Sequence, residues 1–272
     1  MNEVVISLIS LGGIGLVFGI ILSVLDKKLK VEEDPLVKEI MSLLPGINCG
    51  ACGFAGCSAY AKQIAEKKDI LKGCIPGGDA VNSKVSALIG VKAKKAKSLK
   101  VIVKCGAKTG EKKSSFDYSG VKSCAAADLS WANIDCRYGC LGFGDCVQVC
   151  LVQALRIEEQ LVKVDYNKCI GCGKCVEVCP RNVLELVEVT SPDLYVVSCS
   201  NPDKALDTKK VCSKGCIGCG ICVKLVKDSP FELKQGLSKL NYQKAQGRGK
   251  EELDAAKDKC PVKIINSFSS GL

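Results

Sequence analysis

The stretch Cys169-Ile-Gly-Cys172-Gly-Lys-Cys175-Val-Glu-Val-Cys179-Pro180 decides the fold in the middle of this chain. Its cysteines are separated by two, two and three residues, a spacing that lets three thiolates wrap one face of a cubane iron–sulfur cluster. The glycines permit a tight backbone and leave amide groups free to hydrogen-bond the cluster sulfides. The fourth cysteine lies three residues into a helix and points towards a neighbouring cluster. The run therefore predicts two clusters that exchange ligands.

The neighbouring cluster requires ligands of its own, and four cysteines upstream supply them with gaps of three, five and three residues. We assign one [4Fe-4S] cluster to Cys136, Cys140, Cys146 and Cys179. We assign the other to Cys150, Cys169, Cys172 and Cys175. The upstream group has longer gaps than usual, and Leu151 stands where a proline is expected. The two groups predict a ferredoxin module with strands at 154–157, 161–164 and 183–189.

Two further cysteine groups flank this module. The first contains Cys49, Cys52, Cys57 and Cys74. It suits a [4Fe-4S] cluster, or a zinc ion as the alternative. The second contains Cys216, Cys219 and Cys222, followed by Val226 where a fourth cysteine would complete the run and by Cys260-Pro261 as its replacement. The second group predicts a degenerate ferredoxin-like module that kept one cluster.

Four cysteines remain outside these groups: Cys105, Cys124, Cys199 and Cys212. They are either the ligands of a fifth cluster built from distant segments or buried free thiols, which are common core residues. The sequence therefore predicts four or five [4Fe-4S] clusters.

Composition limits the other chemistry available to the cysteines. The chain has 272 residues, twenty cysteines and no histidine. The absence of histidine excludes Cys/His zinc fingers, Rieske centres and His-ligated haem. Aromatic residues make up only 5% of the chain, so we expect thin cores that the cofactors help to cross-link.

An uncharged apolar run from Val4 to Leu25 is long enough to cross a bilayer as one helix. Glu3 precedes it, and Lys27, Lys28 and Lys30 follow it, which favours a retained anchor over a cleaved signal peptide. The lysines predict that everything after residue 26 is cytoplasmic, on the inner face of the cell membrane. Reducing conditions there argue against disulfides. The span offers no carboxylate, so it provides no ionisable group of its own for moving an ion across the bilayer.

The predicted fold is α+β, with one transmembrane helix, a small helical iron–sulfur domain and ferredoxin-like modules. Helices are expected at 35–44, 58–68, 80–89, 232–244 and 250–259, and a strand at 99–103. The expected domains are 1–30 (anchor), 31–90 (N-terminal [4Fe-4S] domain), 91–130 (basic connecting segment), 131–190 (two-cluster module) and 191–272 (C-terminal module).

The basic segment, KAKKAKSLKVIVK at 92–104, has no interleaved aromatic residue, so nucleic acid binding is not expected. A solvated face is the simplest interpretation, and docking of an acidic redox partner or anionic lipid is the alternative. There is no Gly-x-Gly-x-x-Gly after a strand, no Walker loop and no acid–base constellation. The chain therefore shows no nucleotide-binding motif or catalytic constellation of its own.

Four features together resemble the B subunit of the Rnf-type, ion-translocating ferredoxin:NAD+ oxidoreductase complex. They are the N-terminal anchor, the loop Asn-Cys49-Gly-Ala-Cys52-Gly-Phe-Ala-Gly-Cys57, the segment Cys136-Arg-Tyr-Gly-Cys140-Leu-Gly-Phe-Gly-Asp-Cys146, and the ferredoxin run. The resemblance implies that the chain accepts electrons from reduced soluble ferredoxin. It also implies that other membrane subunits, which carry flavin and the NAD site, take these electrons and move Na+ or H+. The chain alone would be an electron carrier within this translocase.

Two alternatives remain open. The chain could be a polyferredoxin that brings electrons to another membrane reductase, or a zinc-stabilised binding module tethered to the membrane. Metal and sulfide content separates these classes.

Overall fold

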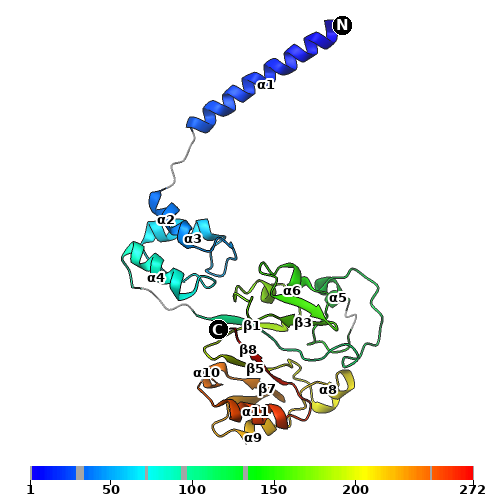
Figure 1. Cartoon of the computed structure of the whole chain (residues 1–272). Coiled ribbons are helices and arrows are strands. Elements are labelled where there is room, and N and C mark those ends of the chain that lie inside the picture. The colour runs from blue at the N-terminus through cyan, green and yellow to red at the C-terminus, as the bar shows by residue number, and fades with distance from the viewer. Residues whose placement is uncertain are drawn as a thin grey trace. The chain divides into compact units, whose positions relative to one another are not determined.

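The computed structural model describes residues 2–28, 34–70, 73–92, 97–130, 134–245 and 247–271 (Figure 1). The chain divides into two compact units, Met1–Glu39 and Ile40–Leu272. The first unit is dominated by α1 (Asn2–Lys28), which from Val5 to Lys28 is long and apolar enough to cross a membrane. None of the side chains described in this span is buried within the protein. The apolar run is thus a single helix, as predicted, and its length and composition suit a membrane span.

Three helices form the N-terminal cysteine region: α2 (Pro35–Leu43), α3 (Cys57–Lys67) and α4 (Gly78–Ile89). The predicted helices at 35–44, 58–68 and 80–89 differ from these by one or two residues. Tyr60 and Ile64 on α3 and Val85 on α4 are buried. The last turn of α4 is closed by Gly90 at φ +73°, a backbone conformation that favours glycine, with the Val91 amide donating to the Ser86 carbonyl.

The central part contains two antiparallel strand pairs and three short helices. Strand β1 (Leu99–Val103) pairs with β4 (Leu184–Glu188), and β2 (Leu155–Glu158) pairs with β3 (Leu161–Val164). The helices are α5 (Cys124–Leu129), α6 (Asp145–Gln148) and α7 (Lys174–Glu177). We expected residues 91–130 only to connect modules, but β1 completes the sheet with β4 because its alternating apolar side chains, Val101 among them, enter the same core as Leu184.

The described residues of the C-terminal part also form two antiparallel strand pairs, here with four helices. Strand β5 (Asp193–Val197) pairs with β8 (Ile265–Ser269), and β6 (Phe231–Lys234) pairs with β7 (Leu237–Leu240). The helices are α8 (Ala205–Val211), α9 (Ile221–Leu225), α10 (Tyr242–Ala245) and α11 (Lys250–Lys259). The predicted helix at 250–259 is confirmed.

The predicted helix at 232–244 is wrong, because most of this segment is the β6–β7 hairpin. The turn residues Gln235 and Gly236 have φ values of +52° and +78°. A two-residue turn with positive φ at both positions has the twist that antiparallel strands require. Phe231 and Ser238, which lie on the same face of the hairpin, are buried, so the hairpin packs this face against the core.

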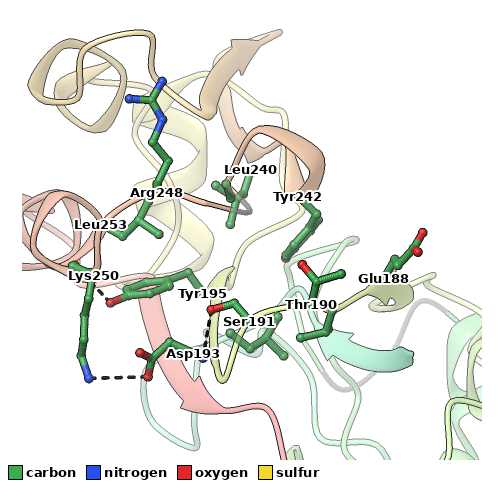
Figure 2. A pocket seen from close by; sticks show the side chains of 13 residues that line it. Glu188, Thr190, Ser191, Asp193, Tyr195, Leu240, Tyr242, Arg248, Lys250 and Leu253 are labelled. Carbon is green, nitrogen blue, oxygen red and sulfur yellow. Dashed lines mark hydrogen bonds and ion pairs between the residues drawn. The ribbon is translucent and has the colours of Figure 1, made fainter. Parts of the chain in front are cut away.

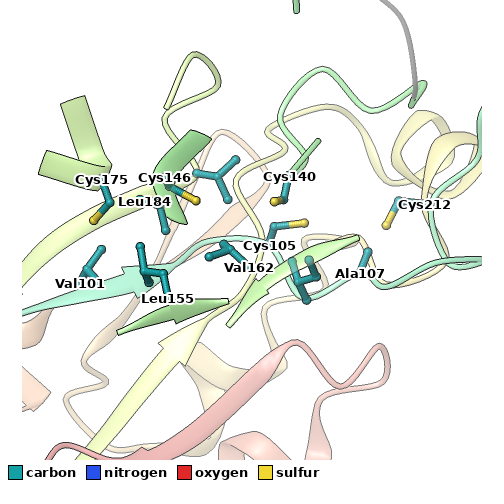
Figure 3. Close-up of a cluster of buried hydrophobic side chains, with 12 residues drawn as sticks. Val101, Cys105, Ala107, Cys140, Cys146, Leu155, Val162, Cys175, Leu184 and Cys212 are labelled. Carbon is teal, nitrogen blue, oxygen red and sulfur yellow. The ribbon is translucent and has the colours of Figure 1, made fainter. Parts of the chain in front are cut away.

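The central core combines aliphatic side chains with thiols. Val101, Leu155, Val162 and Leu184 pack with Cys140, Cys146 and Cys175 in one buried cluster. Figure 3 shows Cys146 and Cys175 beside Leu184. The cysteine loops thus lie on the inner side of the strand pairs, as expected for small modules with thin cores.

Candidate iron–sulfur sites

Three loops of the chain have the same backbone plan, a cysteine followed by two glycines in alternate positions. They begin at Cys140, Cys169 and Cys216, and each leads into a short helix (α6, α7 and α9). The first glycine of each loop has positive φ: +79° at Gly142, +65° at Gly171 and +62° at Gly218. A Cβ on these glycines would lie 2.6 Å from the Gln160 oxygen, 2.2 Å from the Leu99 oxygen and 2.5 Å from the Gly236 oxygen, respectively. Only glycine lets the loops lie this close to the neighbouring backbone.

The cysteines gather in five sets of four, and none forms a disulfide. We number the sets as follows. Site 1 is Cys49, Cys52, Cys57 and Cys74; site 2 is Cys150, Cys169, Cys172 and Cys175; site 3 is Cys124, Cys140, Cys146 and Cys179; site 4 is Cys105, Cys136, Cys199 and Cys212; site 5 is Cys216, Cys219, Cys222 and Cys260.

Site 2 has the predicted composition. Burial first, and then the neighbouring thiols of Cys169, Cys172 and Cys150, raise the pKa of Cys175 to about 12. The Sγ of Cys150 accepts a hydrogen bond of 3.2 Å from the Ala154 amide, which orients it after α6. Crowded, buried thiols of this kind are stable as thiolates only when a metal replaces their protons.

Site 3 differs from the predicted grouping. Cys140, Cys146 and Cys179 line a cavity with Cys124, not with Cys136. The loop beginning at Cys140 carries Phe143 where the loop beginning at Cys169 carries Cys172. The missing thiol therefore comes from another segment.

Cys124 is positioned at the start of α5 by Asp145, the residue next to Cys146. The Asp145 carboxylate accepts hydrogen bonds from the Cys124 amide at 2.8 Å, the Ala125 amide at 3.1 Å and the Ser123 hydroxyl at 2.9 Å. Three hydrogen bonds to one carboxylate fix the helix start firmly. Phe143 packs against Tyr118, with ring centroids 5.5 Å apart, and so occupies the space that a cysteine ligand would otherwise need.

Site 4 contains Cys136 in place of Cys124, which is the second half of the same correction. All four of its cysteines line one cavity. The amide of Asn201 donates to the Cys136 Sγ at 3.9 Å. Arg181, whose side chain is 6% exposed, donates to the Cys136 carbonyl at 2.6 Å and to the Asp128 carboxylate at 2.7 Å. Cys105, Cys199 and Cys212, three of the four cysteines left outside the sequence motifs, thus do come together. The fourth member of the set is Cys136 and not Cys124.

Site 5 has the composition expected from the sequence. Its four cysteines line a cavity whose other walls include Ile217, Val262 and Ile264. Val226, at the position of Cys179, is buried, so it fills the space of a fourth loop cysteine. Cys219 is the one exposed cysteine among the twenty.

Site 1 is held by two asparagines. The Asn48 side chain accepts a hydrogen bond of 2.8 Å from the Cys57 amide. Asn82, which is 2% exposed, accepts from the Cys74 amide at 2.7 Å and donates to the Cys74 carbonyl at 3.3 Å. Burial, followed by the other three thiols of the set, raises the pKa of Cys74.

The donor sets fit iron–sulfur clusters. Each site offers four thiols, and no histidine exists in the chain. Among the described residues, no three ligating side chains converge on one point as they do around a single metal ion. The thiols of sites 3, 4 and 5 instead stand around the walls of cavities, an arrangement suited to a polynuclear group.

A separate pocket contains no cysteine (Figure 2). Tyr195 donates to Asp254 at 2.9 Å, and Lys250 forms an ion pair with Asp193 at 3.5 Å. These contacts fasten β5 to α11. Tyr195, Lys250 and Arg248, which donates to Glu252 and to the Asp228 carbonyl, thus hold together elements of the C-terminal module, so the pocket is part of its scaffold.

Comparisons with known proteins agree with this geometry. The family described as "Putative Fe-S cluster" matches residues 44–76, and "4Fe-4S binding domain" matches residues 162–185. The chain is 35% identical over 267 residues to the B subunit of the ion-translocating oxidoreductase complex of Methanosarcina acetivorans, covering 97% of this chain and 99% of the relative.

Two other relatives also match almost the whole chain. The B subunit of the proton-translocating ferredoxin:NAD(+) oxidoreductase complex of Clostridium ljungdahlii is 36% identical, covering 100% of this chain and 95% of the relative. The Na(+)-translocating counterpart of Acetobacterium woodii is 35% identical, covering 98% of this chain and 78% of the relative. These matches confirm the resemblance seen in the cysteine motifs. The chain belongs to the B-subunit family of the Rnf-type, ion-translocating oxidoreductase complexes.

Proposed function

We propose that this chain accepts electrons from reduced soluble ferredoxin and relays them through five [4Fe-4S] clusters to partner subunits in the membrane. Those partners, which carry flavin and the NAD site, reduce NAD+ and move Na+ or H+. As a member of its family, the chain is an electron-transfer subunit of an ion-translocating ferredoxin:NAD+ oxidoreductase. The donor, the partners and the number of clusters are the parts we add.

The observation that carries the proposal is the continuity of four cysteine sets. The Cys216 amide of site 5 donates to the Cys199 Sγ of site 4 at 3.3 Å. Gly139 lines the cavities of both site 4 and site 3. Sites 3 and 2 exchange ligands, because Cys179 follows the loop of site 2 and Cys150 follows the loop of site 3. The residues thus define a row in the order 5, 4, 3, 2.

A cluster bound at each site would take up and release single electrons at a potential set by its charge, hydrogen bonds and exposure. Cys219 at site 5 is exposed, so a soluble donor can approach this end of the row. The chain carries a net charge of +10, which favours encounters with an acidic protein. Site 1 lies in the sequence between α1 and the rest of the row, so we assign to it the transfer of electrons to the membrane subunits.

The membrane arrangement is part of the same proposal. We place α1 across the inner membrane as a single span, with Lys27 and Lys28 on the cytoplasmic side. All twenty cysteines follow these lysines in the sequence. The cluster sites then face the compartment that contains soluble ferredoxin, NAD+ and a reducing pool of thiols.

Two experiments test this function. Membranes from cells lacking the chain should lose ferredoxin-dependent NAD+ reduction, and undiminished activity would refute the assignment. Anaerobic metal analysis should find about twenty irons per chain with matching acid-labile sulfide. About sixteen irons would mean that one site is empty, whereas zinc without visible absorbance would overturn the cluster assignment altogether.

The direction of transfer has a separate test. Replacing Cys219 with serine should slow the reduction of every other cluster by ferredoxin. Replacing Cys52 with serine should leave ferredoxin able to reduce the remaining clusters while turnover stops. The opposite pattern would place the donor at site 1.

A further inference from the structure

Two buried lysines make the same kind of contact at two different sites. The Lys112 ammonium donates to the Cys140 carbonyl at 2.8 Å and to the Gln160 carbonyl at 2.7 Å. The Lys100 ammonium donates to the Cys169 carbonyl at 3.0 Å and to the Tyr166 carbonyl at 2.8 Å. Cys140 and Cys169 are equivalent, since each begins a glycine loop. Each lysine thus holds the first cysteine of a loop through its carbonyl.

Both lysines are buried, with 8% of Lys112 and 7% of Lys100 exposed. Within the described residues, neither forms an ion pair with a carboxylate, although many surface lysines do. A buried ammonium without a negative partner is strongly unfavourable, and carbonyl dipoles compensate only part of its charge. Something else near each lysine must therefore be negative.

Sites 3 and 2 supply that negative charge if they bind clusters. Four thiolates outweigh the positive charge of the iron–sulfide core, and one added electron makes the site more negative still. A fixed positive charge beside the site stabilises the reduced form more than the oxidised form. The added electron then needs no accompanying proton, because the compensating charge is already present.

The third glycine loop provides an internal comparison. Cys216 begins the loop of site 5, at the position of Cys140 and Cys169. In the part of the chain that the structure describes, no lysine donates to its carbonyl. The buried cation is thus a feature of the two central sites and not a general requirement of the loop.

We propose that Lys112 and Lys100 are buried counter-charges that raise the reduction potentials of the clusters at sites 3 and 2, respectively. Each lysine acts on the cluster through its positive charge and makes no bond to iron. This inference rests on the proposed function, because it requires clusters at these sites. It adds that the two middle positions of the row hold electrons more readily than they would without the lysines.

The test is a redox titration of the cluster-loaded, full-length protein, followed by electron paramagnetic resonance under anaerobic conditions. Lys112→Met and Lys100→Met remove the charge and keep an unbranched apolar side chain of similar length. Each should lower the midpoint of one cluster by about 59 mV or more, which corresponds to a tenfold change in the ratio of reduced to oxidised cluster for one electron. The midpoints of the other clusters should remain.

Matched controls are Lys108→Met and Lys97→Met, which lie a few residues before the two buried lysines. Lys108 pairs with Glu159 on the surface, and Lys97, with 69% of its side chain exposed, pairs with Glu188 at 3.2 Å. Neither control should shift a midpoint. The proposal is wrong if the Lys112 and Lys100 variants retain their full iron content and every midpoint potential stays within about 59 mV of the wild-type value. The lysines would then only support the loops.

A variant that fails to bind iron is resolved by a second substitution. Lys112→Gln and Lys100→Gln are neutral but retain a hydrogen-bond donor. Iron-loaded glutamine variants should show the same lowered midpoints, and unchanged midpoints or iron loss in both substitutions would overturn the proposal. Absence of clusters in the wild type would instead refute the proposed function, so the two failures are distinct.

Discussion

Substituting alanine for Gly171 tests how tightly the loop of site 2 is pressed against β1. A Cβ at this position would lie 2.2 Å from the Leu99 oxygen and 2.8 Å from the Leu99 carbonyl carbon. Gly173, in the same loop, is the matched control. It also has positive φ, at +84°, but its nearest neighbour is the flexible end of Leu186, 3.0 Å away. The two glycines therefore share backbone strain and differ in steric overlap.

The expected cost follows from these contacts. Left-handed backbone costs an L-residue roughly 1–2 kcal/mol, and both variants incur this. At Gly171 the overlap is with backbone that cannot move freely, because Leu99 is paired with Glu188 in the β1–β4 sheet. Overpacking of this kind adds roughly 1–3 kcal/mol. Gly171→Ala should thus be less stable than Gly173→Ala by about 1–3 kcal/mol.

Cluster loss is irreversible, so the assay measures a rate. Both variants and the wild type are loaded with iron anaerobically, and iron release to a chelator is followed at a fixed, mild denaturant concentration. Gly171→Ala should release the iron of one site roughly tenfold faster than Gly173→Ala, since about 1.4 kcal/mol corresponds to a factor of ten. Equal rates in the two variants would refute the steric reasoning, even if both are faster than the wild type.

The remaining predictions concern ligand grouping, the ion pair of the buried Arg181, and the metal as a whole. A double Cys124→Ser, Cys146→Ser variant should lose about four irons, because both residues belong to site 3. A double Cys124→Ser, Cys212→Ser variant should lose about eight, because its two residues belong to different sites. The reverse result would restore the grouping expected from sequence. Arg181→Met should release iron faster in the same chelator assay, by roughly tenfold or more, because it leaves the Asp128 carboxylate and the Cys136 carbonyl without their donor, a loss of roughly 1–3 kcal/mol. A change below about twofold would contradict this. Anaerobic removal of iron should unfold the modules after residue 97 while α1 retains its helical signal, and an unchanged spectrum would show that the cores fold without metal.

Much of this fold could be predicted from local patterns. The uncharged run, the helices at either side of site 1 and the strands at 99–103 and 161–164 depend on period, caps and turn residues close in sequence. Sites 1, 2 and 5 have at least three of their ligands in one short segment or run. Spacing alone therefore indicates which of their thiols can meet.

The exchange of Cys124 and Cys136 could not be found from spacing, because both residues approach their sites through tertiary contacts. A signal was nevertheless present. Aligning the loop at Cys140 with the loop at Cys169 places Phe143 opposite Cys172, which shows that site 3 needs a thiol from elsewhere. It does not show which one, since that depends on the three hydrogen bonds of the Asp145 carboxylate.

The hairpin at 231–240 and the buried lysines were missed for related reasons. Charged residues on the exposed face of β6 and β7 resemble one face of a helix, and only the Gln235-Gly236 turn marks a hairpin. Lys100 lies in a basic stretch that suggests a solvated surface. Its burial depends on carbonyl groups about seventy residues away, at Tyr166 and Cys169.

The composition of site 4 has a consequence for biosynthesis. Its ligands, from Cys105 to Cys212, are distributed over the length of the two ferredoxin-like modules, whereas those of site 1 are encoded within one short stretch. Every ligand of site 1 has been translated once the ribosome passes Cys74, but site 4 cannot form until Cys212 has been translated and the two modules have docked. We expect site 1 to receive its iron first. Site 4, which takes ligands from both modules, should receive its iron late, after the modules have docked. A stalled or truncated chain would then carry the membrane anchor and its first cluster yet lack the connection to the others.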